Sequence, residues 1–229
     1  MNKLGLIGGT GPESTIIYYS KLTSSVQQKT GAFPPLAIDS LSVYEVLGFC
    51  AKGDYDGLAS YLLKGFENLA AAGCDFAALT GITPHIVFER LQEGSPIPLV
   101  SMVDAAAKRA AEKGCKTVLL LGTYPTMTGS FVPEAFAKQG LAMATPSEEE
   151  MRQIEKIIED ELELGICKEE SKEVMLRIIR RCAEENGIDA VLLGCTELPL
   201  LLRDGDLSIP FLDAMTIHIE TLTDMILVG

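Results

Sequence analysis

The chain has 229 residues, of which 47% are hydrophobic and 22% are charged, and its formal net charge is −13. This composition is typical of a soluble globular protein with one or two domains. The negative charge argues against nucleic acids and anionic membranes as partners, because both bind through Lys and Arg. The N-terminus lacks the apolar core and cleavage site of a signal peptide, and no apolar run reaches membrane-spanning length, so a cytoplasmic location is expected.

Short apolar runs alternate with longer segments of helical periodicity. The segments predicted as strands are 4–8, 36–40, 76–80, 99–102, 117–122, 190–194 and 210–212. The segments predicted as helices are 14–28, 55–72, 84–92, 104–113, 147–164, 168–185 and 214–227. This alternation predicts an α/β fold, built from βαβ units with parallel sheets covered by helices. The acidic residues 148–150 mark a solvated helix start rather than a metal site.

Three sequence landmarks occur twice in the same order. Residues 9–12 are echoed by 122–125, residues 73–81 by 187–195, and residues 97–100 by 209–212, at offsets of 113, 114 and 112. Nearly constant offsets indicate two copies of one α/β unit. We therefore predict two similar Rossmann-like lobes with parallel sheets, related by a pseudo-twofold axis. The N-terminal lobe comprises 1–98 with 209–229, and the C-terminal lobe comprises 99–208.

Glycine and hydroxyl residues gather in the loops after repeated strands, at 8–15, 80–85, 122–128 and 194–199. Ligands of open α/β sheets bind beyond the carboxyl ends of the strands, where glycines and helix N-termini let backbone N–H groups approach an anion. A small anionic substrate in a cleft between the lobes is expected. A nucleotide is disfavoured, because residues 8–11 are followed by neither the Lys of a P-loop nor the third glycine of a dinucleotide fingerprint.

Cys195 stands where a thiol could be reactive. It follows a predicted strand and precedes Thr196-Glu197-Leu198-Pro199, a segment with a cap candidate and a proline suited to a first helical turn. Backbone N–H groups there would lower the pKa of the thiol, although a buried strand-end thiol is an equal alternative. The cysteines at 50, 74, 115, 167 and 182 have no zinc-site or disulfide spacing, and most of them are interpreted as core thiols.

Five motifs in order resemble the aspartate/glutamate racemase family. They are Gly8–Thr15 with Tyr18-Tyr19, Thr83-Pro84-His85, Gly122-Thr123 with Thr126, Gly194-Cys195-Thr196-Glu197, and Asp213 with His218. The resemblance spans the whole chain and implies two α/β domains with the active site between them. It also implies an amino acid or related carboxylate as substrate, no pyridoxal phosphate, no metal and a homodimer. Two cysteines then exchange a proton on opposite faces of the substrate's α-carbon.

The resemblance places the second catalytic cysteine at Cys195 and the first at Gly81. Where the family usually has Cys-Asn-Thr-x-His, this chain reads Gly81-Ile82-Thr83-Pro84-His85. Because racemisation needs a group on each face of the α-carbon, the missing side chain bears directly on activity. Cys74, Thr80 or a bound water are the candidates to replace it.

Three functions stay open on these residues. The first is a cofactor-independent amino-acid racemase or epimerase that keeps Cys195 as its acid/base. The second is a one-cysteine decarboxylase or lyase, since the related arylmalonate decarboxylases also have glycine opposite a single cysteine. The third is a catalytically silent homologue that binds carboxylates.

Substrate-binding candidates carry hydroxyl, imidazole or ammonium groups. They are Thr10, Lys52, Thr83, His85, Thr123, Thr126 and Thr196. The threonines would hold the substrate carboxylate as it takes on negative charge, and each also suits a helix cap. Lys52 is the candidate for a distal carboxylate, against a solvated surface role. Residues 161–165 carry acid where some relatives have lysine, which leaves a neutral or cationic substrate open, and His218 is expected to play a supporting role.

Overall fold

The computed structural model describes residues 1–228, whose contacts divide the chain into two compact units. Unit 1 contains residues 1–102 and the C-terminal stretch that begins at His218. Unit 2 runs from Val103 to Ile217. Each unit is an α/β structure with its own parallel sheet.

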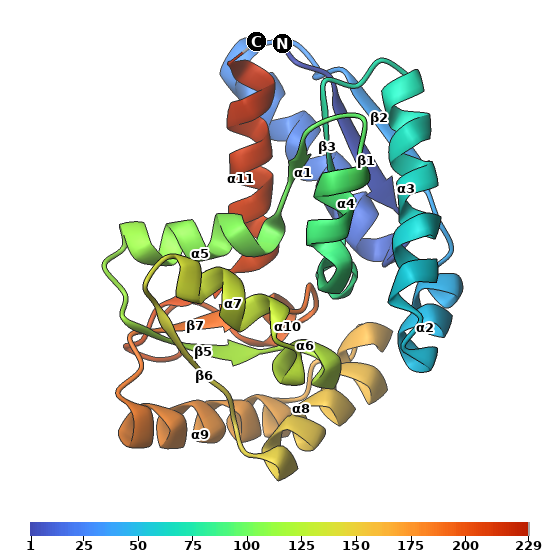
Figure 1. Ribbon diagram of the computed structural model, residues 1–229. Coiled ribbons are helices and arrows are strands. Elements are labelled where there is room, and N and C mark those ends of the chain that lie inside the picture. Colours follow the sequence, from blue (N-terminus) through green and yellow to red (C-terminus); the bar gives the residue numbers. More distant parts are fainter. Residues whose placement is uncertain (229) are drawn as a thin grey trace. The chain divides into compact units, whose positions relative to one another are not determined.

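Unit 1 is built on a four-stranded parallel sheet in the order β2-β1-β3-β4 (Figure 1). Its strands are β1 (Leu4–Gly8), β2 (Leu36–Ser40), β3 (Phe76–Leu79) and β4 (Leu99–Val100). Its helices are α1 (Pro12–Thr30), α2 (Val43–Lys52), α3 (Tyr55–Ala71), the 3-10 helix η1 (Thr83–Val87), α4 (Phe88–Gly94) and most of α11 (Ala214–Leu227). Helices α1 and α3 pack against β1.

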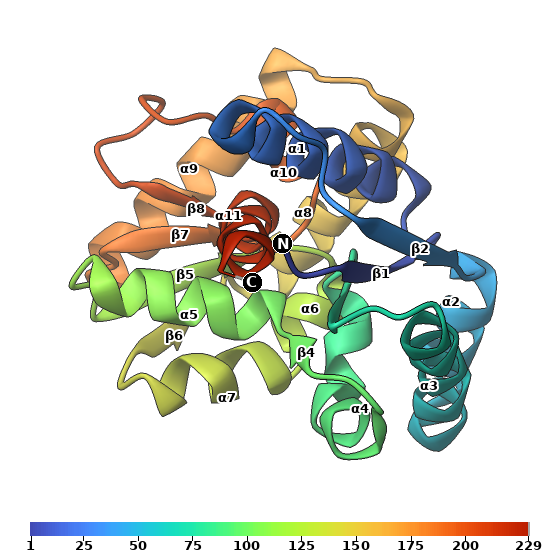
Figure 2. The same cartoon turned by 90° about the horizontal axis from the view of Figure 1, so that it is seen from above.

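Unit 2 has the same strand order in its own sheet, β6-β5-β7-β8 (Figure 2). Its strands are β5 (Thr117–Leu121), β6 (Ala142–Ala144), β7 (Ala190–Leu193) and β8 (Phe211–Asp213). Its helices are α5 (Met102–Glu112), α6 (Tyr124–Thr128), α7 (Phe131–Lys138), α8 (Glu148–Asp160), the 3-10 helix η2 (Leu162–Leu164), α9 (Glu169–Asn186) and α10 (Leu198–Leu201).

The repeat predicted from the sequence extends to strand register. In unit 1, Ile7 of β1 pairs with Leu79 of β3, and in unit 2, Leu121 of β5 pairs with Leu193 of β7. Both pairs are related by an offset of 114 residues. The expectation of two similar α/β units with parallel sheets is thus confirmed.

The backbone continues in the same way for one residue beyond each pair. Thr80 N–H donates to the carbonyl of Ile7 at 3.1 Å, and Gly194 N–H donates to the carbonyl of Leu121 at 2.7 Å. Gly81 and Cys195 follow at once, so they occupy equivalent places at the carboxyl ends of β3 and β7. Gly81 and Cys195 are therefore equivalent in backbone geometry as well as in sequence.

The unit boundaries lie later in the chain than predicted. Strand β4 pairs with β3, and β8 pairs with β7, so each completes the sheet that precedes it in the chain. The first boundary was predicted between residues 98 and 99 and lies between 102 and 103. The second was predicted between 208 and 209 and lies between 217 and 218. The repeated Ile-Pro segments open the last strand of each sheet instead of separating the lobes.

Local signals explain where several helices begin and end. Helix α8 starts with a capping box in which Ser147 and Glu150 bond each other's backbone and side chain, which confirms the acidic run as a helix start. The helix predicted over 147–164 ends at Asp160 and is followed by η2. Gly165 then turns the chain with a φ of 71°, a conformation that favours glycine. Helices α2, α6 and α7 and strand β6 had no clear sequence signal.

Close packing between α3 and β1 leaves little room for a side chain at position 5. A Cβ on Gly5 would lie 3.0 Å from Leu69 Cδ1 and 3.2 Å from Cys74 Sγ. Cys74 is only 5% exposed and belongs to the hydrophobic core of this unit. Its interpretation as a core thiol agrees with this position.

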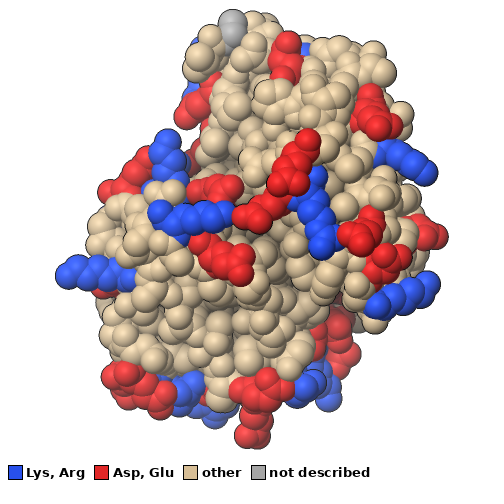
Figure 3. All heavy atoms as spheres, viewed as in Figure 1, with Lys and Arg blue, Asp and Glu red and all other residues tan. Residues whose placement is uncertain are grey.

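Charged side chains of both signs are interspersed on the surface. On the face shown in Figure 3, Lys and Arg lie singly beside Asp and Glu and form no continuous basic patch. Among residues 1–228, no helix is both long and hydrophobic enough to span a bilayer.

Candidate functional site

The carboxyl end of β7 carries a thiol bonded to a carboxylate. Cys195 is half-buried, and its Sγ donates to Glu197 Oε2 at 2.9 Å. The same oxygen accepts a hydrogen bond from Thr196 Oγ1 at 2.7 Å. The short turn into α10, with Pro199 in its first turn, holds these three residues together. The predicted helix start with a proline in its first turn is confirmed, but no side chain caps the helix.

The environment of Cys195 favours the protonated thiol. Burial raises its pKa well above the usual value, and the charge and hydrogen bond of Glu197 raise it further, as does the charge of Glu163. The backbone N–H of Glu197 acts in the opposite direction, but its effect is smaller. A thiol is thus the resting form of Cys195 at neutral pH.

The expectation of a thiol with a lowered pKa at this helix start is wrong. Helix α10 has only four residues, so its dipole is small, whereas Glu197 places a full negative charge in hydrogen-bonding contact with the sulfur. A carboxylate at this distance outweighs the partial positive charge of the helix end.

Acidic groups extend around this thiol. The pKa of Glu163 in η2 is raised, first by desolvation and then by the charges of Glu197 and Glu159. Elements η2 and α10 are in contact. The side of unit 2 that carries Cys195 is therefore negative, which bears on the charge of any substrate.

The remaining unit 2 candidates lie at the ends of β5 and β7. Thr126 is fully buried, and its Oγ1 lies 3.1 Å from Oγ1 of the half-buried Thr123. A Cβ on Gly122 would lie 3.1 Å from Thr126 Cγ2, so the glycine allows this close packing. Thr123 is the more exposed of the two hydroxyls, and Thr196 already donates to Glu197.

In unit 1, the turn between β1 and α1 is held by side-chain hydroxyls. Thr15 Oγ1 accepts from Gly9 N–H at 3.0 Å and donates to the carbonyl of Gly11 at 3.1 Å. It also lies 3.3 Å from Thr80 Oγ1. Gly9 has a φ of 76°, and a Cβ there would lie 2.1 Å from the carbonyl oxygen of Leu41, so only glycine fits.

Thr10 lies beside the empty side-chain position of Gly81. A Cβ on Gly81 would be 3.2 Å from Thr10 Oγ1, 3.5 Å from the Thr10 carbonyl oxygen and 3.7 Å from Pro84 Cδ. Thr10 Oγ1 is buried and has no hydrogen-bond partner within the described chain. An unpaired buried hydroxyl costs about 1–3 kcal/mol, so this atom is suited to a ligand.

Two of the side chains considered as replacements for the missing base are poorly placed. Cys74 precedes β3, at the opposite end of the strand from Gly81, and is packed in the core. Thr80 is fully buried, and its Oγ1 donates to the carbonyl of Ile7 at 3.0 Å. Within unit 1, Thr10 offers the hydroxyl with unused hydrogen-bonding capacity near Gly81.

His85 is in place near Gly81 but has both ring nitrogens occupied. It is 3% exposed, with Nδ1 at 3.1 Å from the carbonyls of Gly81 and Ile82 and Nε2 at 3.1 Å from the backbone nitrogen of Met102. This geometry favours an orienting role for His85 over direct contact with a substrate. Thr83 begins η1 and is half-buried.

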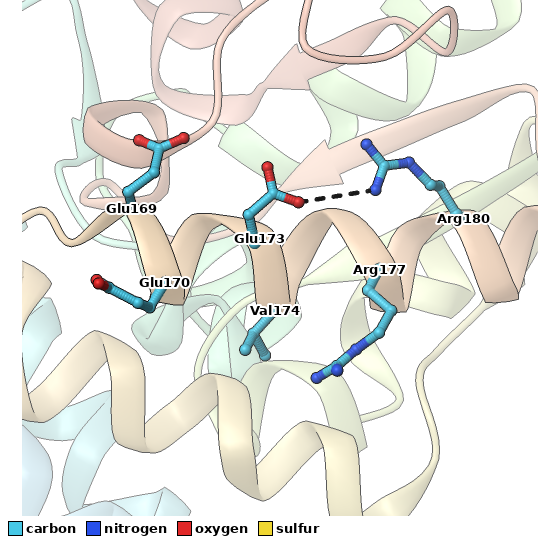
Figure 4. A pocket seen from close by; sticks show the side chains of 6 residues that line it. All are labelled: Glu169, Glu170, Glu173, Val174, Arg177 and Arg180. Carbon is cyan, nitrogen blue, oxygen red and sulfur yellow. Dashed lines mark ion pairs between the residues drawn. The ribbon is translucent and has the colours of Figure 1, made fainter.

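Lys52 and a surface hollow along α9 are not part of the groups of residues around Cys195 and Gly81. Lys52 is exposed as the last residue of α2. A hollow of about 590 Å³ follows the outer side of α9, where Glu173 and Arg180 are paired at 4.0 Å (Figure 4). The hollow is lined by Glu169, Glu170, Glu173, Val174, Arg177 and Arg180. One helix supplies this whole lining, and none of the candidate residues takes part in it.

Sequence reasoning missed that Glu197 and Glu163 act on the thiol, although the acid at 161–165 was expected to bear on the charge of the substrate. Glu197 was part of the Gly-Cys-Thr-Glu motif but received no chemical role, although a carboxylate two residues after a cysteine was the available signal. Glu163 lies 32 positions before Cys195, and only the packing of η2 against α10 shows their proximity.

The comparison with known families gives one match over most of the chain. The sequence profile of the Asp/Glu/Hydantoin racemase family matches residues 7–222. The broad specificity amino-acid racemase RacX of Bacillus subtilis (strain 168) is 26% identical over 140 residues. That match spans 60% of this chain and 61% of the relative, so it covers less than two thirds of the length of RacX.

Solved structures resemble the chain over its full length. A candidate Asp/Glu racemase from Yersinia pestis is 32% identical, with a TM-score of 0.94 over 99% of this chain and 100% of the other. An aspartate racemase homologue from Pyrococcus horikoshii OT3 is 36% identical, with a TM-score of 0.87 over 99% of each chain. Arylmalonate decarboxylase shares the fold at 14% identity, with a TM-score of 0.58 over 99% of this chain and 93% of the other.

Acid is expected to destabilise the protein through His218. Burial is the first cause that lowers its pKa, to about 3, and nearby His85 is the second. The unfolded chain has the higher histidine pKa, so it binds one more proton as pH falls below about 6.5. The free energy of unfolding therefore falls with falling pH, by about 1.4 kcal/mol per pH unit for this group. In His218→Gln, urea titrations between about pH 6 and pH 4 should show a smaller slope by about one proton.

Tyr18→Phe is the matched control for that variant, because it loses the 2.7 Å contact between Tyr18 Oη and His218 Nδ1 but keeps the titrating ring. It should lower stability and retain the slope. Equal slopes in wild type and His218→Gln would show that His218 does not titrate differently in the two states.

Proposed function

The chain belongs to the Asp/Glu/Hydantoin racemase family, and from that premise we propose that it is an amino-acid racemase or epimerase in which Cys195 transfers the α-proton. The proposal includes no pyridoxal phosphate and no metal. The observation that carries it is the 2.9 Å hydrogen bond from Cys195 Sγ to Glu197 Oε2 at the end of β7. It gives an acid/base sulfur with a proton acceptor already in contact.

The pair can move one proton in a balanced cycle. The Cys195 thiol passes its proton to the Glu197 carboxylate, which produces a thiolate and a carboxylic acid. The thiolate removes the α-proton of the substrate, and the C–H electron pair stays on the substrate as a carbanion. If the thiol proton first exchanges with solvent and a solvent proton then returns to the same face, the result is exchange, and Glu197 gives its proton back to the thiolate. If a donor on the other face protonates the carbanion, the result is inversion, and the proton held by Glu197 passes through solvent to restore that donor.

The carbanion has no electron-sink cofactor in this scheme, so hydrogen-bond donors must hold the substrate carboxylate as its charge increases. Thr123 is suited to this task because its hydroxyl is half-buried and is oriented by the buried Thr126. Thr196 acts differently from the predicted substrate contact. By donating to Glu197, it stabilises the carboxylate that receives the thiol proton.

The acidic surroundings of Cys195 favour substrates with neutral or cationic side chains. Glu163 and Glu197 both raise the pKa of the thiol through their charges, which places them within electrostatic reach of the sulfur. A second carboxylate on the substrate would meet the same negative field. Lys52 is exposed at the end of α2, as expected of a solvated surface lysine.

The second face of the substrate depends on position 81, to which the family resemblance assigns the first base. Gly81 has no side chain, but Thr10 Oγ1 lies 3.2 Å from where its Cβ would be. We place there a water bonded to Thr10 as the proton donor for inversion. A hydroxyl or a water is a poor base at neutral pH, so this face is expected to donate a proton far more readily than it removes one.

A decarboxylase is the second candidate, and Gly81 is the observation that favours it. Loss of carbon dioxide from a malonate-type acid leaves a carbanion that needs one proton on one face only. A single thiol acid at Cys195 would be sufficient. Similarity to arylmalonate decarboxylase supports only a shared fold, so substrate tests must separate these reactions.

Solvent-deuterium incorporation at the α-carbon tests the proposal. NMR in heavy water, over a panel of L- and D-amino acids and substituted malonates, should show exchange with amino acids, faster for neutral or cationic ones than for Asp and Glu. Cys195→Ala should lower the exchange rate by about 100-fold or more, because the acid/base group is lost.

Cys115→Ala is the control for removal of a cysteine, since Cys115 precedes β5 and so lies at the opposite end of that strand from Thr123 and Thr126. It should exchange at the wild-type rate. Exchange that survives in Cys195→Ala would contradict the role of the thiol. Carbon dioxide release from malonates without amino-acid exchange would support the decarboxylase, and binding without either reaction would support a silent carboxylate-binding protein.

Gly81→Cys tests the second face. Gly81 is not among the glycines with positive φ, and a Cβ needs only a small movement of the flexible Thr10 hydroxyl. Racemisation by Gly81→Cys should exceed that of Gly81→Ser by about tenfold or more, because a thiol is the better acid and base. Ser adds the same Cβ and nearly the same volume. Equal rates in the two variants, measured by polarimetry, would show that position 81 does not contact the α-carbon.

A further inference from the structure

Both histidines of the chain bond to the same short segment, residues 100–102. This segment begins at the last residue of β4 and ends at the last residue of unit 1 before the chain enters unit 2. His85 contacts Met102 and His218 contacts Val100. His218 is also the first residue of unit 1 after the chain returns from unit 2. The chain therefore leaves unit 1 at a residue bonded to one buried imidazole, and it re-enters unit 1 at the other.

The partners of His85 define its tautomer. The backbone N–H of Met102 can only donate, so His85 Nε2 is the acceptor at 3.1 Å. The proton of the neutral ring is then on Nδ1, which donates to the carbonyls of Gly81 and Ile82, each at 3.1 Å. The ring is stacked on Phe88, with centroids 5.0 Å apart and planes inclined by 10°.

His218 has the opposite tautomer for the same kind of reason. The carbonyl of Val100 can only accept, so Nε2 of His218 carries the proton and donates at 3.2 Å. Nδ1 then accepts from the hydroxyl of Tyr18 at 2.7 Å. The two rings meet edge to face at 5.7 Å, which holds α1 and α11 together.

Burial keeps both rings neutral. Desolvation is the first cause that lowers the pKa of His85 to about 4 and that of His218 to about 3. Tyr18 is the ionisable group bonded to His218, and the charge of His85 lowers the pKa of His218 further. Near neutral pH, each ring therefore has one fixed donor and one fixed acceptor.

We propose that His85 is a positioning residue, which ties the carbonyl of Gly81 to the backbone N–H of Met102 and so fixes the turn that carries Gly81 and Thr83. His218 holds the Val100 end of the same segment, so that Met102 is a rigid support. The inference rests on the proposed function, because the place of Gly81 matters only if the α-carbon is handled there. His85 itself moves no proton, since both of its nitrogens are used.

Two variants test separately the bond of His85 to the Gly81 carbonyl and its bond to the Met102 N–H. His85→Asn places an amide near the position of Nδ1 and keeps a donor for the Gly81 carbonyl, but it cannot reach Met102. His85→Gln places an amide oxygen near the position of Nε2 and keeps an acceptor for Met102, but it loses the donor to Gly81. If both ends are needed, kcat for amino-acid exchange falls by about 10- to 100-fold in each, because small misplacements of a site are costly.

Tyr18→Phe is the matched control. It removes a buried hydrogen bond from the same cluster but leaves the bond of His218 to Val100 and all partners of His85 in place. It should lower the melting temperature and keep kcat within about twofold of wild type at temperatures where it is folded. A wild-type kcat in either His85 variant overturns the tie, and an equal loss of kcat in Tyr18→Phe shows general destabilisation instead.

Ring-nitrogen NMR tests the tie without any activity. Spectra of the wild-type protein between about pH 6 and pH 8 should show protonated Nδ1 in His85 and protonated Nε2 in His218, with neither ring titrating. The Met102 amide should exchange with solvent at least about tenfold faster in His85→Asn than in wild type. The opposite tautomer at His85, or unchanged Met102 exchange, overturns the inference even if the enzyme is active. If no substrate exchanges but the tautomers are as stated, the proposed function fails and the tie is only structural.

Discussion

The register between the two central strands of each sheet decides which residues can take part in chemistry. In both units these strands end in step, and the next backbone N–H donates across to the neighbouring strand. The residue that follows is the first one free of the sheet, and it is Gly81 in unit 1 and Cys195 in unit 2. The same backbone position therefore carries a thiol in unit 2 and no side chain in unit 1.

What surrounds these two positions makes them chemically different. Around Cys195, carboxylates keep the sulfur protonated and provide an acceptor for its proton. Around Gly81, the available groups are neutral, and they are the Thr10 hydroxyl and the backbone braced by His85. Under the proposed function, the sulfur therefore removes the α-proton, and a group near Gly81 donates a proton or holds the substrate. The asymmetry predicts that the enantiomer whose α-hydrogen faces the sulfur exchanges that hydrogen faster than the other enantiomer does.

Much of the fold could be predicted because its signals are local or repeated. The strands at 4–8 and 36–40 were predicted with their observed bounds, since each is a short apolar run between turn residues. The repeat predicted two similar units, but it could not show that β4 belongs to the sheet of β3 and β8 to the sheet of β7. Short elements such as α6 and β6 depend on tertiary contacts and lack a period long enough to detect. At the site, position 195 was found from its motif, whereas its pKa was misjudged because it depends on how the Glu197 side chain is oriented and on the distant Glu163.

The state of the Cys195 thiol is the central claim, and its pH-dependent alkylation tests that claim most directly. The rate of iodoacetamide labelling at Cys195, followed by mass spectrometry of its peptide, reports the thiolate fraction. We predict that wild-type Cys195 reacts more slowly at neutral pH than a free cysteine does, with a midpoint at higher pH. In Glu197→Gln, loss of the neighbouring charge should lower that midpoint and speed labelling at neutral pH. A wild-type midpoint below that of free cysteine, or one that Glu197→Gln does not lower, would contradict the assignment of a thiol acid held by Glu197.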